Sequence, residues 1–184
     1  MILEAEPLDL GADIRAVGIE LVEDSESREP VRGEDAAKLW SRIIPALAGQ
    51  EPWALDFYSH LDRVREYCQF HGIEFHEAAN RCITIPSPEP SKLEALFARF
   101  EGETFGARAG ALVTQGDAAL ESDLASRGAD AYDRVFPNYY FCAICDFENG
   151  SLVVLSKKLW AGEIIRIARR VLEGEEIELR LATS

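Results

Sequence analysis

The sequence predicts an α+β fold in which a mainly antiparallel sheet packs against several helices. The last third of the chain reads as a β-hairpin, an amphipathic helix and a closing strand, and strand-like and helical segments are interspersed before it. With 184 residues, of which 47% are hydrophobic, the chain is long enough to bury one core. A single domain over residues 1–184 is therefore the expectation.

The first part of the chain yields one strand and two helices. Residues 14–22 are rich in β-branched and apolar side chains, which favours a strand, whereas the acidic stretch 23–35 lacks apolar periodicity and indicates a loop or linker. A helix is expected over 36–49, kinked or ended by Pro45. The clearest predicted helix spans 51–72, because one stripe recurs at spacings of three and four. Its members are Ala54, Phe57, Leu61, Val64, Cys68 and His71.

The middle of the chain is interrupted by prolines. Residues 73–75 and 81–85 are expected to pair as short strands, and the proline-rich stretch 86–91 is expected to be a connection. Ser91 and Glu94 have the spacing of a capping box, which predicts a helix that starts at Ser91.

The C-terminal third follows a clear order. A segment over 117–126 looks helical, and residues 139–156 read as a hairpin with Asn149–Gly150 as its turn. An amphipathic helix is expected over 156–174, and the alternating residues 176–182 predict a closing strand.

Charge and composition exclude several classes of function. The formal net charge of −14 argues against binding to nucleic acid or to an anionic membrane, since attraction to phosphate drives both. No segment is long and apolar enough to cross a bilayer. The N-terminal residues carry acids where a signal peptide carries positive charge, so a cytoplasmic location is expected. The four cysteines are then expected to be reduced thiols rather than a disulfide framework.

Cys142 and Cys145 have the C-x-x-C spacing of metal and redox sites. In a strand they point to opposite faces, which favours a buried hairpin over either kind of site. The expected neighbours of Cys145 on its face are Phe141, Ala143 and Phe147. A zinc site would need Cys68 and His71, at C-x-x-H spacing on the predicted helix, as its other ligands. No metal ion and no cofactor is predicted.

His60 and Asp56 form the candidate pair for general-base chemistry. On the predicted helix Asp56 lies one turn before His60, where a carboxylate could orient the imidazole. The sequence has no G-x-S-x-G nucleophile elbow, and such pairs are common on exposed helices. His76 begins HEAAN, in which Asn80 replaces the second histidine of the zinc-protease pattern. No catalytic residue is therefore assigned.

Two stretches raise the question of an anion site. The glycine-spaced segment 102–117 lacks the Lys-Ser/Thr of a phosphate loop and is interpreted as a flexible connection. Lys157 and Lys158 follow Ser156, the expected cap of the last helix, and together with free backbone N–H groups they could receive an anion. The entrance of a ligand pocket there would be lined by Tyr139, Tyr140 and Trp160.

The sequence favours a non-enzymatic binding or regulatory protein, of the bacterial type, whose acidic surface engages a basic protein partner. The acidic stretches Glu23–Glu29 and Glu173–Glu178 are the expected contacts, and a solvated surface without a partner is the alternative. A second hypothesis is a protein or enzyme that binds a small ligand or anion near the C-terminal helix, and a third is a zinc protein. A homo-oligomer through an exposed edge of the C-terminal sheet is compatible with the sequence.

Overall fold

The structure, a computed structural model, describes residues 1–9, 15–78, 82–100, 103–110, 140–146, 150–156 and 159–182. The strands are β1 (Ile2–Asp9), β2 (Arg15–Val22), β3 (Trp53–Phe57), β4 (His76–Ala78), β5 (Cys82–Pro86), β6 (Thr104–Ala109), β7 (Phe141–Asp146), β8 (Ser151–Ser156) and β9 (Glu178–Leu181). The helices are α1 (Gly33–Ala48), α2 (Leu61–His71), α3 (Pro90–Arg99) and α6 (Ala161–Val171).

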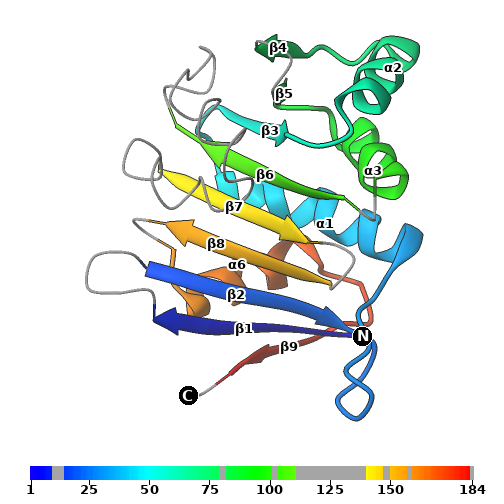
Figure 1. Ribbon diagram of the computed structural model, residues 1–184. Coiled ribbons are helices and arrows are strands. Elements are labelled where there is room, and N and C mark those ends of the chain that lie inside the picture. The colour runs from blue at the N-terminus through cyan, green and yellow to red at the C-terminus, as the bar shows by residue number, and fades with distance from the viewer. Residues whose placement is uncertain are drawn as a thin grey trace.

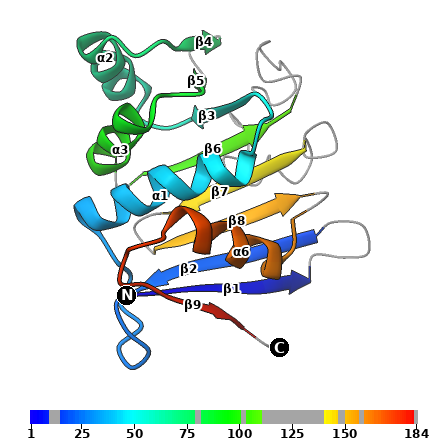
Figure 2. The same ribbon diagram turned by 180° about the vertical axis from the view of Figure 1, so that it is seen from behind.

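The described strands form one sheet in the order β4-β5-β3-β6-β7-β8-β2-β1-β9 (Figure 1). Among these pairs only β1 and β9 run parallel, and every other neighbouring pair is antiparallel. The helices pack against this sheet, and α1 and α6 lie on the same face of it (Figure 2). The predicted α+β class with a mainly antiparallel sheet is confirmed.

The C-terminal hairpin, helix and strand are also confirmed. Strands β7 and β8 pair from Phe141 opposite Ser156 to Asp146 opposite Ser151. The chain then forms α6 and ends in β9, which pairs with β1 rather than with the hairpin. The first and last segments of the chain therefore lie side by side at one end of the sheet (Figure 1).

The predicted long helix over 51–72 is wrong in its first part. Residues Trp53–Phe57 form β3, and the helix α2 begins only at Leu61. All five side chains of β3 are buried, on both faces of the sheet, and the strand lies between β5 and β6. A short strand buried on both faces has no period-two pattern, and Phe57 and Leu61 happen to continue the helical spacing of the next segment. The C-terminal end at Gly72 is as expected, since this residue has the left-handed φ of +60°.

Two strands lie where the sequence indicated something else. The expected connection over 102–117 contains β6, which pairs with β3 and β7. Its small residues give no strand signal of their own, and its place in the sheet comes from long-range pairing. The predicted strand at 73–75 is displaced to His76–Ala78, which pairs with Cys82–Thr84.

Several helix ends also differ from the prediction. Helix α1 begins at Gly33 and continues past Pro45 to Ala48, so the acidic loop is shorter than 23–35. Helix α3 begins at Pro90 rather than at Ser91, because proline suits the first helical position. The N-cap of α6 is Trp160 rather than Ser156. The predicted helix over 117–126 lies outside the described residues.

The main core lies between the sheet and the helices. Trp40 of α1 is fully buried there, and aromatic rings fill the space between α3 and the sheet. The ring centroid of Phe105 on β6 lies 5.1 Å from that of Phe57 on β3 and 5.2 Å from that of Phe97 on α3. Such aromatic contacts contribute beyond the burial of their area.

The opposite side of the sheet, here called the outer face, carries different kinds of side chain on its central strands and on β1 and β2. On β3, β5, β6, β7 and β8 it carries buried small or apolar side chains and the buried pair Asp56 and Arg108. On β1 and β2 it carries glutamates. In the described part of the chain, no helix has the length and hydropathy needed to span a bilayer.

Candidate binding surface

A depression of about 250 Å³ lies on the outer face over β1, β2 and β8. Side chains alternate along a strand, so Leu3 and Ala5 enter the core while Glu4, Glu6 and Leu8 point outward. The lining includes Glu4, Glu6, Leu8, Gly18, Glu20, Arg28, Ser151 and Val153. A Cβ atom on Gly18 would lie 3.4 Å from Leu8 Cδ1, so the absence of a side chain at Gly18 deepens the depression beside Leu8. The depression thus combines an apolar floor with carboxylates.

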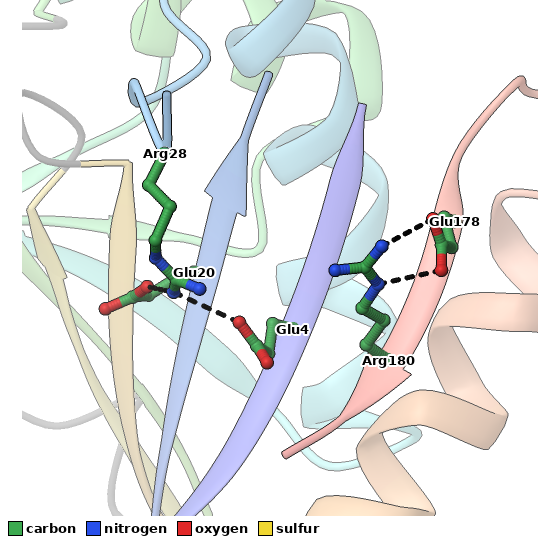
Figure 3. A network of polar contacts seen from close by, with 5 residues as sticks. All are labelled: Glu4, Glu20, Arg28, Glu178 and Arg180. Atoms are coloured by element: carbon green, nitrogen blue, oxygen red, sulfur yellow. Dashed lines mark hydrogen bonds and ion pairs between the residues drawn. The ribbon is translucent and has the colours of Figure 1, made fainter. Parts of the chain in front are cut away.

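Arg28 bridges two of these carboxylates. Its Nη2 atom lies 2.6 Å from Glu20 Oε2 on β2 and 3.0 Å from Glu4 Oε2 on β1. Figure 3 shows the Arg28 side chain extending from its loop over Glu20 toward Glu4. Glu20, and then Glu4, raise the pKa of the Arg28 guanidinium above its usual value. The pair Glu4–Glu20 is therefore a site that already accommodates a guanidinium group.

The loop between β2 and α1 positions Arg28. Asp24 Oδ1 accepts hydrogen bonds from the backbone N–H groups of Ser27, at 2.8 Å, and Glu26, at 2.7 Å, and these lower the pKa of Asp24. Arg28 itself adopts a left-handed φ of +51°. The loop is closed at its base by the N–H of Glu23, which donates to the carbonyl of Glu29 at 2.9 Å. A local Asx turn therefore reverses the chain beyond the end of β2.

Arg180 on β9 extends the charged surface. Its Nε and Nη2 atoms donate to Glu178 Oε1 and Oε2 at 2.7 and 3.0 Å, which lowers the pKa of Glu178. Arg180 is also close enough to Glu4 and Arg28 to interact with both electrostatically (Figure 3). We call the outward carboxylates at this end of the sheet the acidic face. They are Glu4, Glu6, Glu20 and Glu178 on the strands, and Glu23, Asp24, Glu26 and Glu29 on the loop.

The structure brings parts of the two predicted acidic stretches together. Glu23–Glu29 supplies the loop of the acidic face, and Glu178 from Glu173–Glu178 supplies its β9 side. Glu175 lies apart from this face. Its Oε1 atom is 3.1 Å from Lys38 Nζ and 2.6 Å from Arg42 Nη1, and it joins the C-terminal segment to α1. The second stretch is therefore divided between two surfaces.

The candidate pair His60 and Asp56 does not share a helix. Asp56 lies on β3, where it is buried against Arg108, and His60 is the exposed N-cap of α2. The Nε2 atom of His60 lies 3.4 Å from Glu103 Oε2, and Arg63 Nη1 lies 3.3 Å from the other oxygen of Glu103. The expected arrangement is wrong because residues 53–57 are extended, so the one-turn spacing does not exist.

Asp56 and Arg108 form the most buried ion pair described in the chain, with exposed side-chain fractions of 0% and 2%. Arg108 Nε lies 2.6 Å from Asp56 Oδ2, and Arg108 Nη2 lies 3.3 Å from Oδ1. Thr84 Oγ1 on β5 donates to the same Oδ1 at 2.7 Å. The pair ties three neighbouring strands together across the outer face.

The proposed zinc ligands do not converge. Cys145 lies in the main core, and Cys142 lies in the separate cluster of buried apolar side chains on the outer face, so their predicted placement on opposite faces is confirmed. Cys68 is buried in the main core, whereas His71 is exposed beside Tyr67, with ring centroids 4.2 Å apart. Within the described ranges, no three His, Cys, Asp or Glu side chains are grouped so that they could hold a metal ion.

We predict that the native thiols resist alkylation. Burial raises the pKa of Cys68 to about 11 and that of Cys145 well above its usual value, and the thiolate is the reactive form. Iodoacetamide at neutral pH should modify these residues at least about 100-fold more slowly in the native chain than in urea. Mass spectrometry of tryptic peptides measures both rates, and native labelling at the unfolded rate would contradict the burial. The pKa of Cys68 is 9.0 in the unfolded chain and about 11 in the native chain, so the unfolded thiol ionises at lower pH. The contribution of this neutral thiol to the free energy of unfolding is therefore fully present below pH 9.0 and is lost as the pH rises to about 11.

The predicted anion pocket is only partly described. Lys157, Lys158 and Tyr139 lie outside the described residues. Trp160 is 58% exposed at the start of α6. Tyr140 is partly buried against the main core, and its backbone N–H donates to the carbonyl of Ala109 at 2.9 Å.

Sequence reasoning missed Arg28, Gly18 and the strand β1. The segment Ile2–Asp9 does carry a signal, because Leu3 and Ala5 alternate with Glu4 and Glu6 as in a strand with one buried face. Nothing in the local sequence of Arg28 indicates that its side chain crosses two strands. Comparisons with known protein families, curated proteins and solved structures found no significant match to this chain.

Proposed function

We propose that the protein is a non-enzymatic binding protein whose acidic face engages a basic segment of another protein. The observation that carries the proposal is the depression over Gly18, where an apolar floor is combined with the carboxylates of Glu4, Glu6 and Glu20. An arginine side chain of the partner suits this combination, since its aliphatic stem can contact the floor while the guanidinium pairs with carboxylates.

The geometry around Arg28 supports a guanidinium as the recognised group. One nitrogen of Arg28 already lies between Glu4 and Glu20, which shows that their carboxylates are spaced for such a group. Arg28 is half exposed and belongs to a surface loop, so a second guanidinium can compete with it. The net charge of −14 adds long-range attraction for a basic partner.

We predict that neutralising the depression weakens binding of a basic peptide. The probe is a nona-arginine peptide, titrated calorimetrically into the triple variant with Glu4, Glu6 and Glu20 replaced by Gln. Loss of three exposed charge pairs of about 0.2–1 kcal/mol each is expected to raise Kd roughly tenfold. A fall in affinity between about 50 and 300 mM salt is expected for the wild type.

The matched control replaces Glu51, Glu66 and Glu94 by Gln, which changes the net charge equally at exposed positions away from the depression. This variant should bind nearly as well as the wild type. Arg28→Gln should change affinity in the opposite direction, because it removes the competing guanidinium. If both triple variants lose the same affinity, the attraction comes from net charge alone and the site is rejected. Binding that does not respond to salt would also count against the proposal.

A further inference from the structure

Strand β9 forms one edge of the sheet, and in the described chain no strand pairs with it on the side away from β1 (Figure 1). It pairs in parallel with the first half of β1, from Ile2 opposite Glu178 to Ala5 opposite Leu181. An edge strand presents unpaired backbone groups that can add a further strand.

The hydrogen bonds to β1 determine which backbone groups face outward. The N–H of Glu178 donates to the carbonyl of Met1 at 2.9 Å, and the N–H of Ala182 donates to that of Ala5 at 3.0 Å. Backbone groups of successive residues point to opposite sides of a strand, so Leu179 and Leu181 direct theirs toward the free edge. The backbone of Ile177 has the same direction, but its N–H already donates to Glu175 at 2.9 Å and only its carbonyl is offered.

The side chains of β9 also differ between its two faces. Glu178 and Arg180 lie on the outer face with Ile2 and Glu4, and they are bonded to each other (Figure 3). Leu179 packs against the main core from the helix side. Leu181 shares that side but is 50% exposed, which makes it one of the few large exposed apolar residues described.

We infer that β9 pairs antiparallel with β9 of a second copy of this chain, about a two-fold axis at Leu179. Leu179 then forms a hydrogen-bonded pair with its own symmetry mate, and the outward N–H of Leu181 meets the carbonyl of Ile177 of the second copy. Glu178 lies opposite Arg180 of the second copy, and the reverse pair forms as well. These are non-hydrogen-bonded positions, where facing side chains are closest.

Charge selects this register. An axis at Glu178 would place two glutamates opposite each other, and an axis at Arg180 would place two arginines opposite each other, both of which are unfavourable. Charged residues usually protect an edge from pairing, but the order Glu-x-Arg is complementary to itself under two-fold symmetry. The rest of the β1 edge is blocked, because Pro7 lacks an N–H at a position that, like Ala5, faces outward.

Charge reversal at two positions tests the pairing. Sedimentation velocity of the wild type should show a species of about twice the 20.5 kDa of one chain, in a concentration-dependent equilibrium. Glu178→Arg and Arg180→Glu should each raise the dimer Kd by about tenfold or more, because each creates two like-charge pairs.

Sedimentation of an equimolar mixture of the two variants is the decisive experiment. Each contact between the Glu178→Arg chain and the Arg180→Glu chain joins arginine to glutamate, so the equimolar mixture should regain dimer that neither variant forms alone. Both chains remain strongly acidic, which excludes general attraction as the cause. A wild type that stays monomeric up to about 1 mM would overturn the inference. So would a dimer that neither variant weakens, or a mixture that stays monomeric. The test is independent of peptide binding at the depression.

Discussion

Breaking the buried ion pair is expected to lower the free energy of unfolding by about 3–5 kcal/mol, for either Asp56→Val or Arg108→Met. Each single change leaves the other charge in a place from which water is excluded, since the two side chains are 0% and 2% exposed. Proteins of this size are stable by about 5–15 kcal/mol, so either variant loses a large share of its stability.

The double variant separates the charge effect from simple loss of packing. With both Asp56 and Arg108 replaced, neither charge of the pair remains buried, and we expect the double variant to be at least as stable as the more stable single variant. Thr84 loses its acceptor in every variant that lacks Asp56, which leaves a residual cost of about 1 kcal/mol.

Urea unfolding followed by circular dichroism measures all three variants and gives the coupling energy of the pair. The matched control is the exposed pair Glu163 and Arg166 on α6, for which removal of one partner should cost less than about 1 kcal/mol. Additive losses at Asp56 and Arg108 would show that the two side chains contribute by packing and not as an ion pair.

The ion pair also shows why part of the molecule escapes prediction from sequence. The two residues are 52 positions apart, and they meet only because β3 and β6 are neighbours in the sheet. Neither strand carries a strong local signal. The segment Trp53–Phe57 is buried on both faces and is followed closely by a helix, and Thr104–Ala109 is rich in small residues.

The hairpin of β7 and β8 was predictable for the opposite reason. Its alternation is local, and a single turn fixes its register, so Cys142 and Cys145 could be assigned to opposite faces before the fold was known. The candidate binding surface was predictable only in part. The acidic stretch that supplies Arg28 was evident from composition, but its contact with Glu4 and Glu20 depends on how β1 and β2 pair.

Gly150→Ala is expected to destabilise the fold by roughly 2–5 kcal/mol, from a strained backbone and a steric clash together. Gly150 has a φ of +62°, and a Cβ atom there would lie 2.7 Å from the carbonyl oxygen of Leu21 and 2.8 Å from Pro30 Cβ. These atoms form the base of the loop that carries Arg28. The N–H of Leu21 donates to the Gly150 carbonyl at 2.8 Å, and the N–H of Val31 donates to the Leu21 carbonyl at 3.0 Å.

Gly72→Ala isolates the backbone part of this cost. Gly72 has a nearly identical φ of +60°, but no atom lies within 4 Å of the position of its Cβ. Its replacement should cost only about 1–2 kcal/mol in the same urea measurement. The excess at Gly150 then measures the packing of the loop base against the β7–β8 hairpin. Because this contact holds the loop in place, Gly150→Ala should also move Arg28 away from Glu4 and Glu20, which backbone and side-chain NMR shifts would record. If Gly150→Ala and Gly72→Ala lower the free energy of unfolding equally, the loop base moves to accommodate the new Cβ atom without a measurable loss. Arg28 would then be held in place by Glu4 and Glu20 alone.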